Sequence, residues 1–148
     1  MSAMPSFSTM WTHYPRGSSA EVKAKIGGNV NLGWVTNTCV IRLSYCFNKA
    51  QHAIPNGYAG LSTARGGDGL RYAYRVREFN TYLGTRYKAP EISGPSNAAA
   101  VAGKKGIIMF DVDGWSDATG HFDLWDGNSC AGSDYFDKAQ SVSLWICE

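Results

Sequence analysis

The sequence of 148 residues carries 14 Lys and Arg against 12 Asp and Glu, a formal charge of +2. So small an excess argues against a nucleic-acid or membrane-surface partner. The hydrophobic fraction of 44% with 18% charged residues excludes an intrinsically disordered chain, and the length predicts one domain over residues 1–148. The 17 Gly, 5 Trp and 8 Tyr residues favour a loop-rich protein with β structure over a helical bundle.

Apolar runs are short throughout the sequence. None approaches the roughly 18 residues that a membrane span needs, so we expect no membrane insertion. Residues 1–15 lack the basic region and the apolar stretch of about 7 to 15 residues that define a signal peptide. If the protein acts outside its cytoplasm, we expect a dedicated machine to carry it there.

The four cysteines are Cys39, Cys46, Cys130 and Cys147. They include no Cys-x-x-Cys pair, so we expect no structural zinc site and no metal. They are also too few for a disulfide scaffold. In an oxidising compartment, Cys130 and Cys147 are the pair we expect to form a bridge.

The first helix is predicted near the N-terminus, where Phe7, Met10, Trp11 and Tyr14 have amphipathic spacing before Pro15. We interpret these apolar side chains as core residues. A glycine-punctuated loop follows over residues 27–33, without the Lys and Ser/Thr of a phosphate-binding loop.

The strongest helical pattern covers residues 39–50. Val40, Leu43, Phe47 and Ala50 form one apolar stripe over about three turns. The polar residues 36–38 offer side chains that can cap its start, and the Pro and Gly at positions 55 and 57 limit its length.

Cys39 is thereby placed in the first turn of a buried helix. Unpaired N–H groups and the positive end of the helix dipole stabilise a thiolate there, so Cys39 is a candidate nucleophile. Cys46 lies two turns deeper along the same side, and we interpret it as a core residue.

The middle of the chain is predicted to hold a glycine-rich surface loop over residues 57–69 and a second helix. Tyr72, Val76, Phe79 and Leu83 give that helix its apolar stripe, and Gly84 its C-terminal stop. The arginines at 71, 75 and 77 are interpreted as a solvated face. Residues 90–103 are expected to form an irregular connection or a short helix.

The last third is predicted to form an antiparallel sheet. Residues 105–112 are typical of a central strand, and an Asp-Gly turn follows at 113–114. Residues 120–127 alternate, with His121, Asp123 and Trp125 on one face and Phe122 and Leu124 on the other. Residues 141–147 form a further alternating strand. Helices first and a sheet later give an α+β fold class.

A cysteine at a helix start with a strand-borne histidine far downstream is the layout of a papain-like thiol hydrolase. His121 is the favoured base because the strand can bring it across the helix terminus. His52 lies about three helical turns from Cys39 and is too far away, and His13 belongs to the N-terminal aromatic segment.

Four blocks of the sequence resemble the fourth family of type VI secretion amidase effectors: NTCVIRLS at 37–44, GIIMF at 106–110, GHFDLWDG at 120–127 and LW at 144–145. The resemblance implies a papain-like fold of the NlpC type, with N-terminal helices packed on a C-terminal antiparallel sheet. It also implies a toxin that cleaves the γ-D-glutamyl–meso-diaminopimelate bond of peptidoglycan stem peptides.

The same resemblance implies where the protein is made, how it is exported and which partners it has. The protein would be made in the bacterial cytoplasm, exported by components of the type VI system, and active in the periplasm of rival cells. A cognate immunity protein would occlude the active-site cleft. No cofactor, metal or nucleic acid is implied.

Carried over to this sequence, the resemblance makes Cys39 the nucleophile and His121 the general base. The family's third residue is an Asp soon after the histidine strand, but no Asp stands two positions past Cys130. Asp134 is the nearest candidate, since Asp123 was expected to point along its own strand and the Asp at 126 to belong to a turn.

Oxyanion and substrate contacts are expected around the same helix start. The backbone N–H of Cys39 is the expected oxyanion donor. Asn37 or Thr38 offers a side-chain donor, although capping is the more natural role of both. Arg42, Arg71 and Arg75 are candidates to orient the carboxylates of the stem peptide, and Arg42 is favoured because it lies one turn below Cys39.

Two other function classes fit parts of the sequence. A non-catalytic cell-wall or carbohydrate-binding module would use tryptophans to stack on sugars. A thiol acyltransferase would use the same nucleophile and release adducts in place of hydrolysis products.

Overall fold

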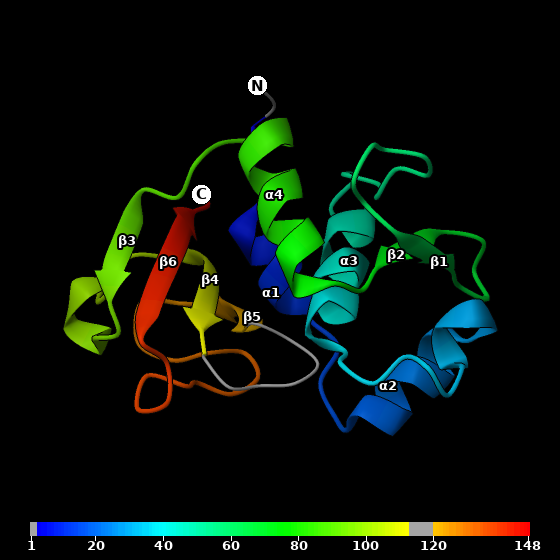
Figure 1. Ribbon diagram of the computed structural model, residues 1–148, viewed down its shortest axis with the longest axis horizontal. Coiled ribbons are helices and arrows are strands. Elements are labelled where there is room, and N and C mark those ends of the chain that lie inside the picture. The colour runs from blue at the N-terminus through cyan, green and yellow to red at the C-terminus, as the bar shows by residue number, and fades with distance from the viewer. Residues whose placement is uncertain (1–2, 113–119) are drawn as a thin grey trace.

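The computed structural model describes residues 3–112 and 120–148, which form helices and an antiparallel sheet (Figure 1). The helices are α1 (Phe7–His13), α2 (Ser19–Ile26), the 3-10 helix η1 (Gly28–Asn31), α3 (Cys39–Lys49), α4 (Val76–Arg86) and the 3-10 helix η2 (Ala98–Ala100). The strands are β1 (Thr63–Arg65), β2 (Arg71–Ala73), β3 (Ile92–Pro95), β4 (Gly106–Asp111), β5 (Gly120–Trp125) and β6 (Ser141–Ile146). The predicted α+β class is confirmed.

The larger sheet has the strand order β3-β6-β4-β5, and every neighbouring pair is antiparallel. Adjacent β4 residues Ile107 and Ile108 belong to different apolar clusters, so the sheet is covered on both faces. Strand β5 lies at one edge of the sheet. Among the described residues, the other side of β5 pairs with no named strand and is approached by the loop that follows β5, where Trp125 forms an isolated bridge with Cys130.

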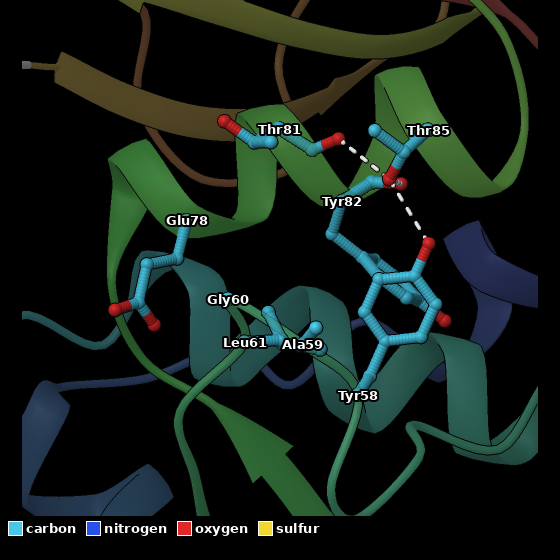
Figure 2. Close-up of a pocket in the computed structure, with 8 residues that line it drawn as sticks. All are labelled: Tyr58, Ala59, Gly60, Leu61, Glu78, Thr81, Tyr82 and Thr85. Carbon is cyan, nitrogen blue, oxygen red and sulfur yellow. Dashed lines mark hydrogen bonds between the residues drawn. The ribbon is translucent and has the colours of Figure 1, made fainter.

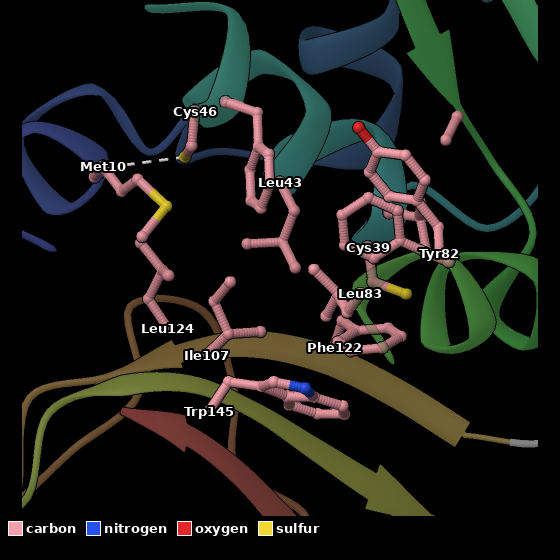
Figure 3. Packing of buried hydrophobic residues seen from close by; sticks show 14 of the residues in the cluster. Met10, Cys39, Leu43, Cys46, Tyr82, Leu83, Ile107, Phe122, Leu124 and Trp145 are labelled. Atoms are coloured by element: carbon pink, nitrogen blue, oxygen red, sulfur yellow. Dashed lines mark hydrogen bonds between the residues drawn. The ribbon is translucent and has the colours of Figure 1, made fainter. Parts of the chain in front are cut away.

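One face of the sheet packs against α1, α3 and α4. Phe122 of β5 meets Phe79 of α4 edge to face at 5.3 Å, and Trp145 of β6 lies beside Phe122 (Figure 3). Leu43 and Phe47 of α3 belong to the same fully buried cluster. This cluster fixes α3, and therefore its first residue, against the sheet.

Helix α3 confirms the predicted apolar stripe and its start. Its first residue is Cys39, and Val40, Leu43 and Phe47 are buried. The helix ends at Lys49, before the Pro and Gly that were expected to limit it. Gln51 adopts a φ of +66°, a left-handed conformation that no α-helix continues through.

The second predicted helix begins later than expected. Tyr72 lies in β2, opposite Ala64 of β1, and α4 begins only at Val76. The buried hydroxyl of Ser44 on α3 accepts a hydrogen bond from the N–H of Ala73, which holds this segment as a strand. Gly84 lies inside α4 and does not end it.

The β1–β2 hairpin replaces part of the loop predicted at 57–69. Its turn passes close to η1. A Cβ added at Gly28 would lie only 2.6 Å from the backbone of Gly66 and Gly67, so this approach leaves no room for a side chain. Gly28 also has a φ of +60°, which favours glycine. Helix α2 was not predicted, although its start carries a capping box of Ser18 and Glu21.

The predicted strands of the last third are present as β4, β5 and β6. The region expected to be irregular contains β3, which pairs with β6, and η2. The Asp-Gly turn predicted at 113–114 lies outside the described residues. Within residues 3–112 and 120–148, no helix has the length and apolar character needed to span a membrane.

Candidate active site

Cys39 lies at the N-terminus of α3 and is 3% exposed. Its backbone N–H donates a hydrogen bond to the side-chain Oδ1 of Asn37 at 3.0 Å. Thr38, the N-cap residue, shares a hydrogen bond between its Oγ1 and the Oγ of Ser19 at 2.9 Å, which ties α2 to this helix start. The partial positive charge of the helix terminus therefore acts on a thiol whose backbone is firmly held.

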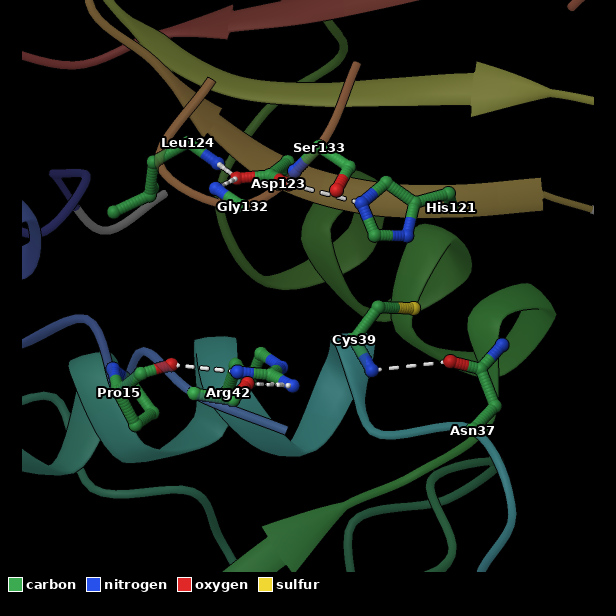
Figure 4. Close-up of polar contacts among 10 residues, drawn as sticks. Pro15, Asn37, Cys39, Arg42, His121, Asp123, Leu124, Gly132 and Ser133 are labelled. Carbon is green, nitrogen blue, oxygen red and sulfur yellow. Dashed lines mark hydrogen bonds and ion pairs between the residues drawn. The ribbon is translucent and has the colours of Figure 1, made fainter. Parts of the chain in front are cut away.

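His121 projects from β5 toward Cys39 (Figure 4). Its Nε2 lies 2.9 Å from Oδ2 of Asp123. Nδ1 is therefore the ring nitrogen left to serve the thiol. Burial alone would lower the pKa of His121, but hydrogen bonds to Asp123 and Cys39, with the charges of those groups, raise it to about 9.

Asp123 is fully buried and its carboxylate is saturated with hydrogen bonds. The backbone N–H groups of Leu124 and Gly132 donate to Oδ1, at 2.8 and 2.9 Å. The N–H of Ser133 donates to Oδ2 at 3.0 Å. Three fixed donors together with the imidazole fix the orientation of the carboxylate.

The carboxylate beside His121 is thus Asp123, whereas the sequence analysis assigned this place to Asp134. Asp134 is exposed in the loop between β5 and β6. Residues i and i+2 of a strand point to the same face, so the two short side chains of His121 and Asp123 can meet. The expectation that Asp123 would point along its strand overlooked this contact.

Arg42 lies one turn below Cys39, as expected, but its guanidinium contacts backbone. Nη1 donates to the carbonyl of Pro15 at 2.8 Å and Nη2 to that of Gly17 at 3.0 Å. These bonds hold the segment between α1 and α2 against α3. The structure therefore uses Arg42 to join elements of the fold.

The four cysteines are free thiols, so the expected Cys130–Cys147 bridge is absent from the described structure. Cys147 belongs to the cluster on the helical face of the sheet, and Cys130 packs against the cluster on the other face. A disulfide needs Cα atoms within about 7 Å, and the intervening sheet prevents that approach. Cys46 is buried in the core, as predicted.

Other groups around the site were not found from sequence. The ring of Tyr135 meets that of His121 edge to face at 4.7 Å. Tyr14 is buried nearby, and its pKa is raised above the ordinary range by burial and by the charge of Asp123. An aromatic spacing pattern identifies such residues as core and carries no signal of a neighbouring carboxylate.

His52 lies away from the site, as its distance along the helix predicted. Its Nδ1 lies 3.1 Å from the hydroxyl of Tyr87. Among the described residues, no group of three or more His, Cys, Asp or Glu side chains is arranged to hold a metal ion.

A cavity of about 280 Å³ lies between residues 58–61 and α4 (Figure 2). The Tyr58 hydroxyl is hydrogen-bonded to Thr85 at 3.0 Å, and the Glu78 carboxylate accepts from the N–H of Ser62 at 2.7 Å. The residues that line the cavity include Tyr82 but neither Cys39 nor His121. The cavity is thus separate from the reactive groups.

The geometry brings together a thiol at a helix N-terminus, an imidazole and a buried carboxylate. The imidazole can take the proton of the thiol and hold it, because its raised pKa favours the imidazolium. The carboxylate stabilises that imidazolium and fixes the tautomer of the neutral imidazole. This arrangement can form a thiolate that attacks an acyl carbon.

Comparisons with known proteins give one consistent family. The model of type VI secretion system amidase effector protein 4, Tae4, matches residues 35–145. Effector Tae4 from Enterobacter cloacae is similar in structure, with 33% identity, a TM-score of 0.91 and coverage of 100% of both chains.

Two effector–immunity complexes are similar as well. A chain of the Tae4–Tai4 complex from Enterobacter cloacae shows 31% identity and a TM-score of 0.90, over 98% of this chain and 99% of that one. The Tae4–Tai4 complex from Salmonella Typhimurium gives 32% identity and a TM-score of 0.90 over the same shares. No curated protein matches the sequence.

Proposed function

The chain belongs to the Tae4 family of type VI secretion amidase effectors, and on that premise we propose that it is a cysteine amidase acting on peptidoglycan stem peptides. The bond cleaved is the one between the γ-carboxyl of D-glutamate and meso-diaminopimelate. The observation that carries this proposal is the line of three groups from the Cys39 thiol through His121 to Asp123. A nucleophile on a helix terminus with a base on a sheet supports a papain-like fold of the NlpC type, as a single domain over residues 1–148.

Catalysis begins when His121 accepts the thiol proton. The Cys39 thiolate attacks the γ-carbonyl carbon, a C–S bond forms and the carbonyl oxygen becomes an oxyanion. As the C–N bond breaks, the His121 imidazolium protonates the departing amine of diaminopimelate. A thioester then links Cys39 to the glutamyl residue.

The second half-reaction regenerates the enzyme. His121 removes a proton from a water molecule, which attacks the thioester carbonyl and displaces the Cys39 thiolate. The products are a free glutamate carboxylate and the amine released earlier. Asp123 stabilises the imidazolium in both halves but exchanges no proton itself.

The backbone N–H of Cys39 and the side chain of Asn37 are proposed to meet the carbonyl of the substrate. In the resting enzyme this N–H is bonded to Oδ1 of Asn37. During the reaction the N–H of Cys39 must therefore leave Oδ1 of Asn37 and donate to the developing oxyanion. An oxyanion attracts an N–H donor more strongly than an amide oxygen does.

The proposal extends to delivery and partners. Relatives are found in Tae4–Tai4 effector–immunity complexes. We therefore propose that this protein is made in the cytoplasm, exported through type VI secretion components and active in the periplasm of target cells. A cognate immunity protein would protect the producer by occluding the active site around Cys39.

The alternative of a sugar-binding module finds less support in the placement of tryptophans. Trp125 and Trp145 are buried and cannot stack on a sugar, whereas Trp34 is exposed. Trp115 lies outside the described residues. A thiol acyltransferase would share the nucleophile and differs only in its products.

The test is digestion of purified peptidoglycan followed by mass spectrometry of the fragments. Wild-type protein should release fragments ending in a free glutamate γ-carboxyl, and Cys39→Ala should release none. Cys147→Ala is the matched control, because this thiol lies after β6 in the apolar cluster and contacts neither His121 nor Asp123, so cleavage should be unchanged. Intact stems with wild-type protein, or cleavage that survives Cys39→Ala, would refute the proposal, and adducts would identify a transferase.

A further inference from the structure

The loop after β5 folds back on the strand and brings Gly132 opposite Asp123. Asp126 closes the turn, since its Oδ1 accepts from the N–H of Asn128 at 2.8 Å. The N–H of Ala131 then donates to the carbonyl of Leu124 at 2.9 Å. The returning chain therefore runs beside β5 at the level of the catalytic carboxylate.

The absence of a side chain at Gly132 is what makes room for that carboxylate. A Cβ added there would lie 2.7 Å from Oδ2 of Asp123 and 2.9 Å from the hydroxyl of Tyr14. Neither neighbour can withdraw easily, because Asp123 is held by three N–H groups and His121, and Tyr14 is buried. Gly132 has no left-handed φ, so its backbone conformation does not itself require glycine.

The space beside His121 is equally reachable from the loop. A carboxylate oxygen lies about 2.4 Å from its own Cβ, the span of two covalent bonds. The Cβ position at residue 132 is 2.7 Å from Oδ2 of Asp123, the oxygen that bonds Nε2 of His121. An aspartate at 132 therefore has the reach to bring a carboxylate oxygen to the place of that oxygen, if Asp123 were gone.

We propose that the carboxylate site beside His121 can be filled from residue 123 or from residue 132, but not from both, and that Gly132 reserves it for Asp123. This inference rests on the proposed function, in which the carboxylate orients the catalytic base. Asp123 is then a positioning residue that acts through His121, and Gly132 is the residue that decides which element supplies the carboxylate.

Titratable groups face this carboxylate from several elements. They are His121 on the same strand, Cys46 on α3, Tyr14 after α1, and Cys130 and Tyr135 in the returning loop, while Cys39 faces the imidazole of His121. Burial raises the pKa of Tyr14, Cys130 and Tyr135, so these three groups stay uncharged near neutral pH. The titration of His121 therefore reports whether a carboxylate is in place.

The experiment moves the carboxylate from the strand to the loop. It compares wild type, Asp123→Ala, Asp123→Ala with Gly132→Asp, and Asp123→Ala with Gly132→Asn as the uncharged control. The chain has 3 histidines, so NMR of the imidazole rings can follow His121 directly, with His121→Gln for assignment. Stem-peptide cleavage is measured in parallel, and thermal unfolding verifies that each variant is folded.

Asp123→Ala should lower the pKa of His121 by at least one pH unit and the cleavage rate at least tenfold. The pair with Gly132→Asp should recover at least half of the pKa shift and at least tenfold in rate over Asp123→Ala. The pair with Gly132→Asn should recover neither. A folded Gly132→Asp pair that stays at the level of Asp123→Ala in both readouts would overturn the proposal.

The steric half of the proposal has a separate test that leaves Asp123 in place. Gly132→Ala should cut the cleavage rate at least tenfold and lower the pKa of His121, because its methyl group displaces the carboxylate. Wild-type values for Gly132→Ala would overturn the claim that Gly132 makes the room, and this test decides the matter if Asp123→Ala does not fold. If no variant cleaves stem peptides, the amidase proposal fails, and the His121 titration still tests this inference.

Discussion

The raised pKa of His121 makes the stability of the fold depend on pH in a defined window. In the unfolded chain the imidazole titrates near 6.5, whereas in the folded protein its pKa is about 9. A group whose pKa is raised by folding stabilises the native state fully below its unfolded pKa, and this stabilisation is lost as the pH rises through the folded pKa. Stability should therefore fall between pH 6.5 and 9.

The size of the effect follows from the two pKa values. The difference corresponds to about 3 kcal/mol in total, of which about 1.5 kcal/mol is lost between pH 6.5 and 8. The His121 side chain is only 14% exposed, so screening by solvent reduces the effect little. Measurements should stop at pH 8, because thiols of the unfolded chain ionise above it while buried thiols such as Cys46 do not.

Urea denaturation at pH 6.5, 7.2 and 8 measures the free energy of unfolding, with His121→Gln as the control. His52 acts outside this window, since burial lowers its pKa and its contribution is lost as the pH falls below 6.5. Between pH 6.5 and 8, the free energy of unfolding of the wild type should fall by about 1.5 kcal/mol more than that of His121→Gln. Equal slopes for the two proteins would refute the reasoning that folding adds a proton to His121 above pH 6.5.

Three further outcomes follow from other contacts. Arg42→Ala should lower the free energy of unfolding by about 1.5 kcal/mol in urea denaturation, because its charged hydrogen bonds to Pro15 and Gly17 are lost, and it should leave KM unchanged. A raised KM with unchanged stability would instead make Arg42 a substrate contact. Ser44→Ala should cost about 1–3 kcal/mol by the same measurement, because the N–H of Ala73 loses its buried acceptor, and an unchanged value would contradict this. Alkylation in denaturant without a reductant should modify all four thiols, whereas a mass showing only two modified thiols would reveal a disulfide.

The sequence predicts best where the chemistry is local. The apolar stripe of α3 places Cys39 at a helix start, and strand alternation places His121 and Asp123 on one face. Both patterns arise from backbone periodicity, which the chain carries in the order of its own residues. The helix-terminal position of Cys39 and the shared face of His121 and Asp123 are therefore predictable without a structure.

The identity of the third group depends on tertiary contacts that no period encodes. Asp134 lies at a plausible distance along the chain but is exposed, whereas Asp123 is held by N–H groups of a loop that returns to the strand. The boundary of α4 was misplaced for a similar reason, since a hydroxyl on α3 fixes Ala73 as a strand. The predicted disulfide is wrong for the same kind of reason, because the sheet separates Cys130 from Cys147.

The central claim is that Cys39, His121 and Asp123 together cleave the γ-D-glutamyl bond to diaminopimelate. The most direct measurement is kcat/KM on the defined stem peptide L-Ala-γ-D-Glu-meso-diaminopimelate, with products identified by mass, for wild type and for Cys39→Ala, His121→Gln and Asp123→Asn. We expect release of L-Ala-D-Glu by the wild type, no turnover with Cys39→Ala and a loss of about a hundredfold or more with His121→Gln and Asp123→Asn. Cleavage at a different bond, or turnover that survives loss of the Cys39 thiol, would contradict it.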